Sequence, residues 1–294
     1  MAVTKKLNYR ILLFTSILLG LQLTSMGQKK PPPYFQTGWV RPYEPFQIVG
    51  NLYYVGTYDL GCYLITTPNG HILINTGLDE SINSIRSGVE KLGFRFSDIK
   101  ILLATHAHHD HVGAFAAIKK ETGARILINE NDAAELADGG ESDYAMGGDG
   151  ILFEPVKPDS LLHKKDTIRF GGMQIISLHH PGHTKGATSF LFDIKDKDRS
   201  YRVLIANMPT VLDGVTLSGM PTYPNIRADY TFTFDDLKNL QFDIWLASHA
   251  SQFRLHTKRK PGDLYNPQVF MDRAGFDKVL DDYKRLFLSR LNGN

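Results

Sequence analysis

Residues 106–111 read HAHHDH, which places four of the eleven histidines of the chain within six positions. In extended backbone, residues two apart project to the same side, so His106 and His108 can bind one metal ion. Asp110 and His111 follow, where the chain turns from a strand toward a helix, and can reach a second ion. The run therefore predicts the first ligands of a two-metal centre.

His109 is the member of this run that we expect to project away from the others, either behind the ligands or at the surface. The alternative for the whole run is a solvent-exposed polar loop without a metal. It is disfavoured because four imidazoles and a carboxylate packed together without a cation are electrostatically unfavourable. His71, His163 and His256 lie in hairpin, loop and basic contexts and are predicted to be ordinary surface residues.

Two further histidines complete the predicted sites. His183 stands in the run HHPGHT, where Pro-Gly makes a turn after an apolar stretch; His179 and His180 are expected to flank the site or lie in the strand. His249 follows another apolar stretch. The predicted ligand sets are His106, His108 and His183 for the first metal, and Asp110, His111 and His249 for the second.

Imidazole-rich ligand sets with open coordination positions suit Zn²⁺ and leave room for a bridging water. A bound Zn²⁺ lowers the pKa of water from about 15.7 to about 7, which provides a hydroxide nucleophile at neutral pH without a serine or cysteine. The sequence thus predicts a hydrolytic centre with two zinc ions per chain.

The predicted ligands follow short apolar runs typical of buried strands, at residues 99–104, 173–178 and 244–247. Further strands are predicted at residues 46–49, 52–55, 62–67, 71–75, 125–129, 167–170, 188–193 and 202–206. Helices are predicted at residues 79–92, 112–122, 130–137, 234–240 and 275–291. Because strands and helices alternate without a repeat or a linker, residues 46–294 are predicted to form one α/β domain.

Two segments of this domain invite separate predictions. Residues 138–149 are glycine-rich and unpatterned, and a loop of this length is either functional or mobile. In the last helix, helical spacing produces one apolar stripe that is predicted to pack in the core. Its members are Phe276, Leu280, Tyr283, Phe287 and Leu291.

The first 27 residues have the features of an export signal: basic residues, an apolar run at 11–23, and small residues at Ser25 and Gly27. The apolar run is shorter than the roughly 20 residues needed to span a bilayer, although an uncleaved membrane anchor is the alternative. Residues 28–45 are predicted to form an extended leader, because three successive prolines forbid a helix there. The mature protein is expected in the periplasm, without stable membrane association.

Composition excludes several classes of protein. The chain has 294 residues with 42% hydrophobic residues, too many for a disordered polymer. Its 33 basic and 31 acidic residues provide no polybasic field, so no nucleic-acid partner is expected. The single cysteine, Cys62, excludes an intramolecular disulfide and is predicted to be a packed core thiol.

Residues 105–111, 181–184 and 248–249 together resemble the metallo-β-lactamase superfamily, and the chain from about residue 46 resembles its subclass B3. The resemblance implies a four-layer αββα sandwich, in which two mixed β-sheets carry helices on both outer faces. It also implies hydrolysis of β-lactam antibiotics, namely penicillins, cephalosporins and carbapenems, by a zinc-bridging hydroxide in a monomeric resistance enzyme. Asp110 would bind the second zinc and orient the hydroxide.

The chain departs from the family pattern at three places. Asn75 stands where an aspartate behind the ligands is usual, and is expected to weaken ligand positioning rather than abolish metal binding. Met208 lies where many relatives carry serines; Met208 and Thr210 are the candidate substrate contacts, although a methionine cannot hydrogen-bond a carboxylate. A disulfide common in the last third of relatives is impossible here.

Two other functions compete with the β-lactamase interpretation. One is another exported two-zinc hydrolase of the same superfamily: a lactonase, a thioesterase of the glyoxalase II type, or a phosphodiesterase. Such relatives usually have a metal-bridging aspartate after the third histidine, whereas this chain has Asn207 and Met208 there, with Asp213 too late. The other is a non-catalytic metal-binding protein, which the complete ligand sets disfavour.

Overall fold

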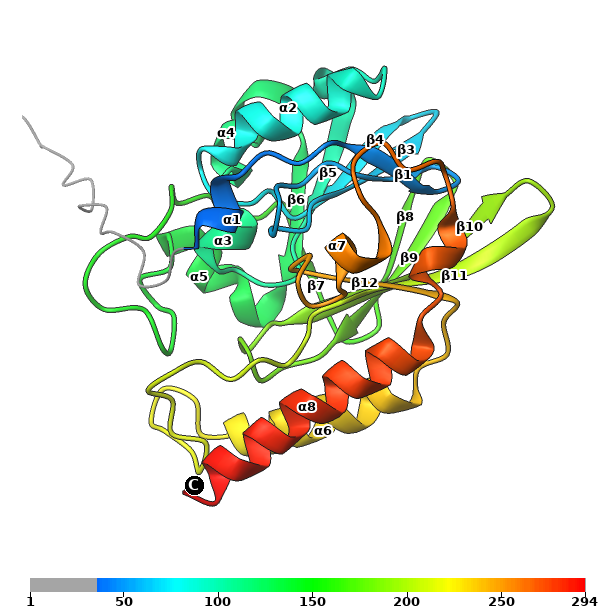
Figure 1. The fold of residues 1–294 in the computed structure, drawn as a ribbon. Helices are drawn as coiled ribbons and strands as arrows, with labels where there is room; N and C mark the ends of the chain where they lie inside the picture. The colour runs from blue at the N-terminus through cyan, green and yellow to red at the C-terminus, as the bar shows by residue number, and fades with distance from the viewer. Residues whose placement is uncertain (1–35, 294) are drawn as a thin grey trace, which may run out of the picture.

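Two β-sheets face each other at the centre of the molecule, and helices cover their outer faces in the computed structural model (Figure 1). The structure describes residues 36–293, so the predicted export signal at residues 1–27 lies outside the described residues. The predicted αββα sandwich is confirmed. Within residues 36–293, no helix is both long and apolar enough to cross a membrane.

The first sheet has seven strands in sequence order. Strands β1 to β4 form an antiparallel meander, and β4 to β7 are parallel. Its strands are β1 (Phe46–Val49), β2 (Leu52–Tyr54), β3 (Tyr63–Thr67), β4 (Gly70–Ile74), β5 (Ile99–Leu103), β6 (Arg125–Asn129) and β7 (Ser160–Leu162). The strand β7, which pairs with β6 over only three residues, is too short to have been recognised from the sequence.

The second sheet has five strands in the order β12-β11-β10-β9-β8. All neighbours are antiparallel except β11 and β12, which are parallel. Its strands are β8 (Thr167–Phe170), β9 (Met173–His179), β10 (Thr188–Asp196), β11 (Arg199–Ala206) and β12 (Ile244–Ala247). The β10–β11 hairpin extends to Asp196 and Arg199, beyond the strands predicted at residues 188–193 and 202–206.

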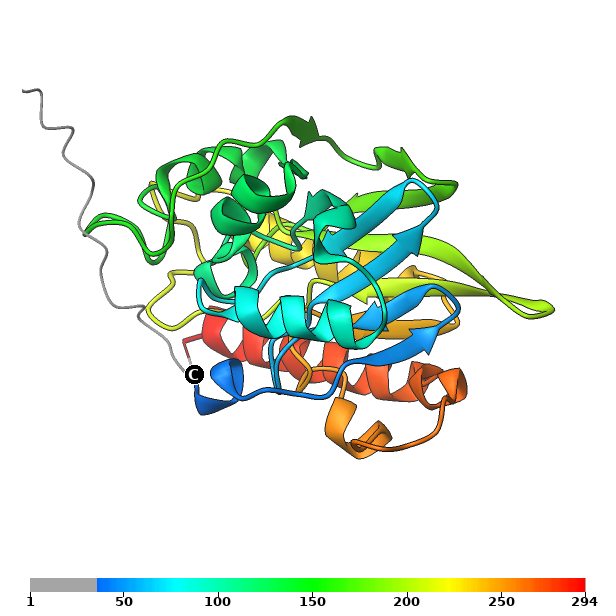
Figure 2. The same cartoon turned by 90° about the horizontal axis from the view of Figure 1, so that it is seen from above.

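Helices lie on both outer faces, as Figure 2 shows from above. On the side of the first sheet are α2 (Ser81–Lys91), α3 (His109–Val112), α4 (Phe115–Thr122) and α5 (Ala133–Asp138). On the side of the second sheet are α6 (Ile226–Asn239) and α8 (Arg273–Leu291). The remaining α-helices are α1 (Thr37–Val40) and α7 (Leu255–Lys258), and short 3₁₀ turns are η1 (Phe96–Asp98), η2 (Glu130–Asp132) and η3 (Pro267–Phe270).

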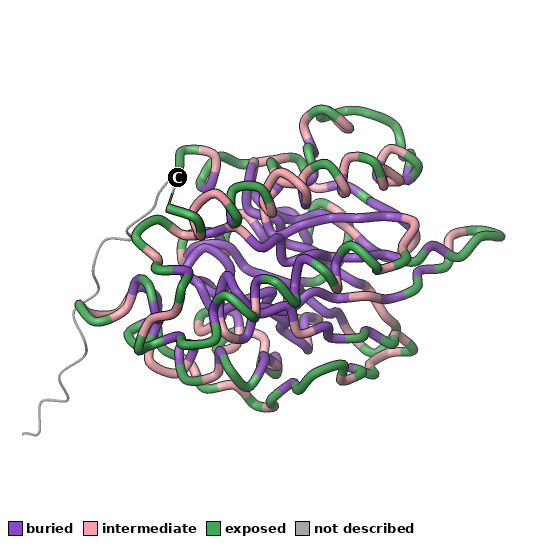
Figure 3. The backbone as a smooth tube through the Cα atoms, turned by 90° about the horizontal axis from the view of Figure 1, so that it is seen from below, coloured by how far each residue is buried: buried purple, intermediate pink, exposed green. Residues whose placement is uncertain are grey.

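The strands bury both faces, as the buried backbone of Figure 3 shows. Along β3, Tyr63 and Ile65 contribute to the core between the sheets, whereas Leu64 belongs to the core under the outer helices. This follows from the alternation of side chains along a strand, and explains why the strands are continuously apolar. Cys62 is buried, as predicted, and burial raises the pKa of its thiol.

Three expectations about the elements are corrected. The helix predicted over residues 112–122 begins only at Phe115, because Ala114, with φ of −89° and ψ of 6°, separates α4 from α3, which ends at Val112. The leader expected to be extended through residue 45 contains α1, whose Trp39 is buried. His71 is buried rather than exposed, with its ring centroid 5.4 Å from that of Phe94, because β4 lies inside the first sheet.

Candidate metal centre

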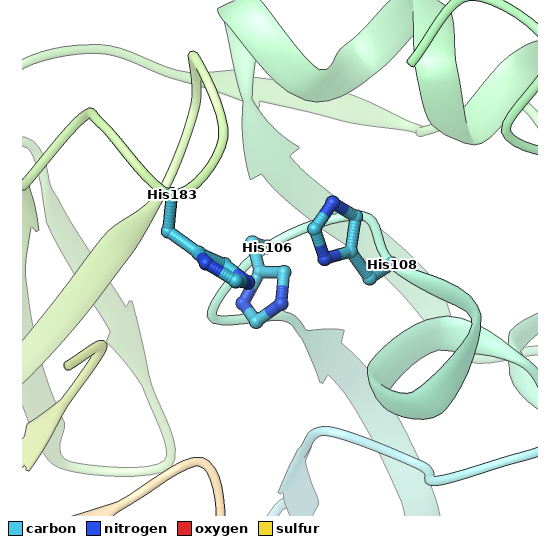
Figure 4. A group of neighbouring side chains, drawn as sticks. All are labelled: His106, His108 and His183. Atoms are coloured by element: carbon cyan, nitrogen blue, oxygen red, sulfur yellow. The ribbon is translucent and has the colours of Figure 1, made fainter. Parts of the chain in front are cut away.

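The three histidines of the first predicted set converge from two loops (Figure 4). His106 and His108 follow β5, and His183 follows β9 in the facing sheet. One ring nitrogen from each lies within 4.8 Å of the others, and all three rings are buried. Spacing and position after strands predicted this convergence, and the arrangement has the size of a metal-binding site.

Each of these rings has one nitrogen facing a protein oxygen. The Nε2 atom of His108 lies 3.3 Å from an oxygen of Asp143, and Nδ1 of His183 lies 2.9 Å from the carbonyl oxygen of Thr210. Nδ1 of His106 lies 3.4 Å from the hydroxyl of Thr105. Such contacts fix the tautomer and orientation of a metal-binding imidazole, and leave the opposite nitrogen for the metal.

The second predicted set gathers around one carboxylate. An oxygen of Asp110 lies 3.2 Å from Nε2 of His111 and 3.3 Å from Nε2 of His249. The rings of His106 and His111 have centroids 4.2 Å apart, so the two sets adjoin. The second set therefore lies next to the first, as a two-metal centre requires.

The charges of these groups suit metal binding. Burial, together with the neighbouring His108, lowers the pKa of His183 to about 3, so the ring is neutral at pH 7. Burial alone would lower the pKa of His249, but the carboxylates of Asp110 and Asp59 raise it to about 9, so a metal ion that binds this ring displaces a proton. Despite its burial, Asp110 keeps a pKa well below its usual range because of His111 and His249. An ionised carboxylate among imidazoles is a donor set for divalent cations.

Unsatisfied polar atoms test whether a metal fits this cluster. Nε2 of His106 is buried and has no hydrogen-bond partner among the described residues. A buried nitrogen without a partner is costly unless something absent from the protein chain binds it. Together with the donor types, this atom indicates that the residues present fit a pair of metal ions.

A groove of about 270 Å³ opens over the ligands. His108, Asp110, His183 and His249 reach it. Its other walls come from loops and helices far apart in sequence, and include Gln36, Trp39, Asp59, His109, Met146, Thr210, Leu212, Ser251, Gln252 and Tyr283. Among the described residues that line it, none is a lysine or an arginine.

Comparison with known proteins places this centre in a family. The family model of the metallo-β-lactamase superfamily matches residues 62–196. A β-lactamase from Chitinophaga pinensis is 57% identical, with a TM-score of 0.87, over 88% of this chain and 98% of that one. This chain belongs to the metallo-β-lactamase superfamily. The resemblance on which the sequence analysis relied is thus confirmed.

Two further solved structures place the chain beside subclass B3 within the metallo-β-lactamase superfamily. The class B3 di-zinc metallo-β-lactamase LRA-12 from an Alaskan soil metagenome is 56% identical, with a TM-score of 0.87, over 89% of this chain and 99% of that one. The metallo-β-lactamase GOB-18 from Elizabethkingia meningoseptica is 51% identical, with a TM-score of 0.88, over 91% and 99%.

Curated relatives in the metallo-β-lactamase superfamily are more distant, and this chain spans only part of their length. It covers 63% of the protein YobT of Bacillus subtilis, at 29% identity over 50% of this chain. It covers 42% of a hydroxyacylglutathione hydrolase of Rhodopseudomonas palustris, at 30% identity over 45% of this chain.

In this metallo-β-lactamase, three aspartates that the sequence analysis did not select position the ligands. Asp143, from the glycine-rich loop, accepts hydrogen bonds from the backbone N–H groups of Ala145 and Met146 while its other oxygen faces His108. The loop is thus ordered around a ligand contact. Its run of glycines indicated a special loop, but nothing in the sequence indicated which of its residues faces a histidine.

Asp132 joins the two loops that carry the first ligand set. One of its oxygens accepts from the backbone N–H of Ala107 at 3.1 Å and the hydroxyl of Thr184 at 2.8 Å; the other accepts from the N–H of Gly186 at 2.6 Å. These bonds hold the loop that carries His106 against the loop that carries His183, although the two loops follow strands of different sheets.

Asp59 plays a similar part for His249. Its carboxylate lies 3.2 Å from Nδ1 of His249 and accepts a hydrogen bond from the N–H of Ser251 at 2.9 Å. The contact fixes the ring with Nε2 toward Asp110. A contact between residues 190 positions apart carries no sequence signal.

Asn75 lies behind the ligands, and both polar atoms of its side chain are hydrogen-bonded. It has φ of 60°, which asparagine tolerates better than most residues. Its side-chain oxygen accepts from the N–H of Thr105 at 2.9 Å, and its amide nitrogen donates to the carbonyl of Gly61 at 3.3 Å. Since the Thr105 hydroxyl faces His106, Asn75 acts on that ligand through Thr105.

The structure also locates the remaining candidate residues, and Met208 is the one that lies elsewhere than expected. Met208 is buried in the core between the sheets and does not line the groove, so substrate contact is not retained for it. Thr210 does line the groove, and also holds His183. His109 is not at the surface: it is buried, with its ring centroid 5.9 Å from that of Trp39. His180 is buried beside the site, between Ser189 and Asp236.

Proposed function

We propose that this chain is a zinc-dependent β-lactamase that hydrolyses the β-lactam ring of penicillins, cephalosporins and carbapenems and so confers antibiotic resistance. The observation that carries the proposal is the pair of adjoining ligand sets beneath one groove. Support comes from high identity over nearly the whole length of proteins named as β-lactamases, one of them a di-zinc enzyme.

In the proposed enzyme, His106, His108 and His183 bind the first Zn²⁺, and Asp110, His111 and His249 bind the second. Two zinc ions supply an activated hydroxide at neutral pH and polarise the carbonyl of the lactam. Asp110 stays ionised, so its carboxylate can accept a hydrogen bond from the attacking water and orient it. Trp39, Met146 and Leu212 provide apolar surface against which a bicyclic substrate can pack.

A thioesterase is the second candidate, because hydroxyacylglutathione hydrolases are among the curated relatives. The position of Asp213 argues against it. This carboxylate pairs with Arg290 at 2.6 Å in an exposed setting, rather than with the metal ligands. Asn207 and Met208 are both buried, and neither lines the groove.

A substrate panel tests the proposal. The purified protein with added zinc should hydrolyse a chromogenic cephalosporin and a carbapenem, and a chelator should abolish the reaction. Parallel assays on a lactone, a glutathione thioester and a phosphodiester provide the contrast. Hydrolysis of one of these without hydrolysis of either lactam would refute the β-lactamase proposal in favour of that activity.

We further propose that residues 1–27 are removed on export, that the mature enzyme acts as a monomer in the periplasm, and that the hydrolase domain begins near Thr37 rather than at residue 46. The burial of Trp39 against the groove supports the earlier start. Amino-terminal sequencing of the protein recovered from the periplasmic fraction would locate the cleavage site, and light scattering would give the mass in solution.

A further inference from the structure

One wall of the groove comes from the carboxy-terminal helix α8, which reaches it through Tyr283. The sequence analysis placed Tyr283 in an apolar core stripe. Its neighbours in that stripe, Phe276 and Phe287, are indeed buried. Tyr283 itself packs against the core but is only partly buried and also borders the groove, so its hydroxyl can have a role besides core packing.

A chain of hydrogen bonds orients the hydroxyl of Tyr283. The backbone N–H of His249 donates to the side-chain oxygen of Gln252 at 3.2 Å. The side chain of Gln252 also interacts with the Tyr283 hydroxyl and lowers its pKa, which is the effect of an NH₂ group that donates to the phenol oxygen. The hydroxyl hydrogen of Tyr283 is then left for an acceptor other than Gln252.

The same helix holds the opposite side of the groove. Arg290 donates to the carbonyl oxygen of Leu212 at 2.9 Å and to that of Val211 at 3.3 Å. Residues seven apart lie on the same face of a helix, so Tyr283 and Arg290 contact the two sides from one rigid element. The position of Tyr283 relative to the groove is therefore set by regular structure rather than by a flexible loop.

The charges around the groove indicate what Tyr283 binds. A β-lactam antibiotic carries a carboxylate, yet no lysine or arginine is among the described residues that line the groove, whereas Asp59 and Asp110 are. Apart from the two proposed zinc ions, the groove therefore offers an anionic substrate polar side chains rather than a lysine or an arginine. The hydroxyl of Thr210 lies 3.0 Å from Nδ1 of His183 and is engaged there, while Tyr283 lies beside Gln252 at the His249 side.

Resting on the proposed function, we propose that Tyr283 is a substrate-binding residue whose hydroxyl donates a hydrogen bond to the substrate carboxylate at the His249 side of the groove. Burial raises the pKa of this phenol, so it remains protonated and able to donate at neutral pH. The contact would contribute to binding of every anionic substrate and little to the bond-breaking step.

The test compares the Tyr283→Phe enzyme with the wild type on a chromogenic cephalosporin, supplied both as the free acid and as its methyl ester. Loss of a hydrogen bond to a charged group should lower kcat/KM for the acid about tenfold, chiefly through KM. For the ester the change should stay within about twofold, because the charged acceptor is gone. Zinc content should match the wild type, since the ligand sets are intact.

Tyr53→Phe is the matched control: this tyrosine is half-buried on β2 against Phe94 and does not line the groove. An equal loss on acid and ester, no loss on the acid, or a loss of zinc from Tyr283→Phe would each overturn this inference alone. A wild-type protein that hydrolyses neither compound would overturn the proposed function, and this inference with it.

Discussion

Replacing Asp143 by asparagine removes the oxygen that faces His108, and with it the negative charge that lies beside the buried Glu135. The oxygen that accepts from the N–H groups of Ala145 and Met146 is retained as the amide oxygen, so the turn of the loop is preserved. The other oxygen, 3.3 Å from Nε2 of His108, becomes an NH₂ group that cannot accept a hydrogen bond. The ligand His108 then loses the partner that fixes its tautomer.

The size of the effect follows from the pKa of Asp143. Burial alone would raise it, yet the hydrogen bond and charge of His108 lower it from 3.8 to about 2. At about 1.4 kcal/mol per pKa unit, the contacts of the carboxylate together outweigh its burial by about 2 kcal/mol, and His108 makes the largest of these contacts. Loss of such a partner commonly reduces metal affinity 10- to 100-fold, and 2 kcal/mol falls within that range.

Zinc affinity, measured by competition with a chromophoric chelator, checks this prediction. Asp143→Asn should bind the first zinc, the one held by His106, His108 and His183, at least about tenfold less tightly than the wild type. Glu141→Gln is the matched control, because Glu141 lies in the same loop but its side chain accepts from the N–H of Gly150 and touches no ligand. Unchanged affinity in Asp143→Asn, or an equal loss in both variants, would refute the reasoning.

Four further predictions concern the ligands, the residue behind them, and pH. His183→Ala should remove zinc and lower kcat more than about 100-fold. His180→Ala, which loses contacts to Ser189 and Asp236 instead, should retain zinc. Loss of zinc from His180→Ala but not from His183→Ala would show that the wrong histidine was chosen. Asn75→Asp places a carboxylate oxygen where the amide nitrogen donates to the Gly61 carbonyl at 3.3 Å. The variant is therefore expected to lose about 1–3 kcal/mol of unfolding free energy, seen as a lower melting temperature. An unchanged melting temperature would contradict the contact. In chelator-treated protein, stability should fall as pH drops below about 6.5, because His183, with its pKa lowered to about 3, resists protonation only when folded. It should also fall as pH rises from about 6.5 toward 9, because His249, with its pKa raised to about 9, then loses a proton that stabilises the fold; thermal unfolding that is flat across this window would contradict both signs.

Local patterns were sufficient to predict most of the architecture. The strands over Arg125–Asn129, Thr167–Phe170 and Ile244–Ala247 lie where their apolar runs begin and end. The helix α6 begins eight residues before the predicted start, because its buried face includes Tyr230 and Thr233, whose polar groups obscured the helical period. Boundaries fail where a polar side chain is buried by a specific partner.

In the candidate site, the metal ligands could be predicted from the sequence, whereas the residues that orient them could not. Histidines after strand ends could be selected from spacing, because the ends of neighbouring strands meet at one edge of a sheet. The carboxylates that orient them could not, since Asp59, Asp132 and Asp143 reach their partners only through tertiary contacts. The place of Tyr283 at the groove could not be predicted for a related reason: helical spacing identified the face that packs on the core, but not which of its residues also borders a groove.

The central claim is that six side chains bind two zinc ions side by side, and a crystal structure of the zinc-loaded protein with anomalous data at the zinc edge tests it most directly. We expect two anomalous peaks, one within bonding distance of His106, His108 and His183, and the other of Asp110, His111 and His249. A single peak in zinc-replete crystals, or any of these six side chains turned away from the metals, would contradict the account.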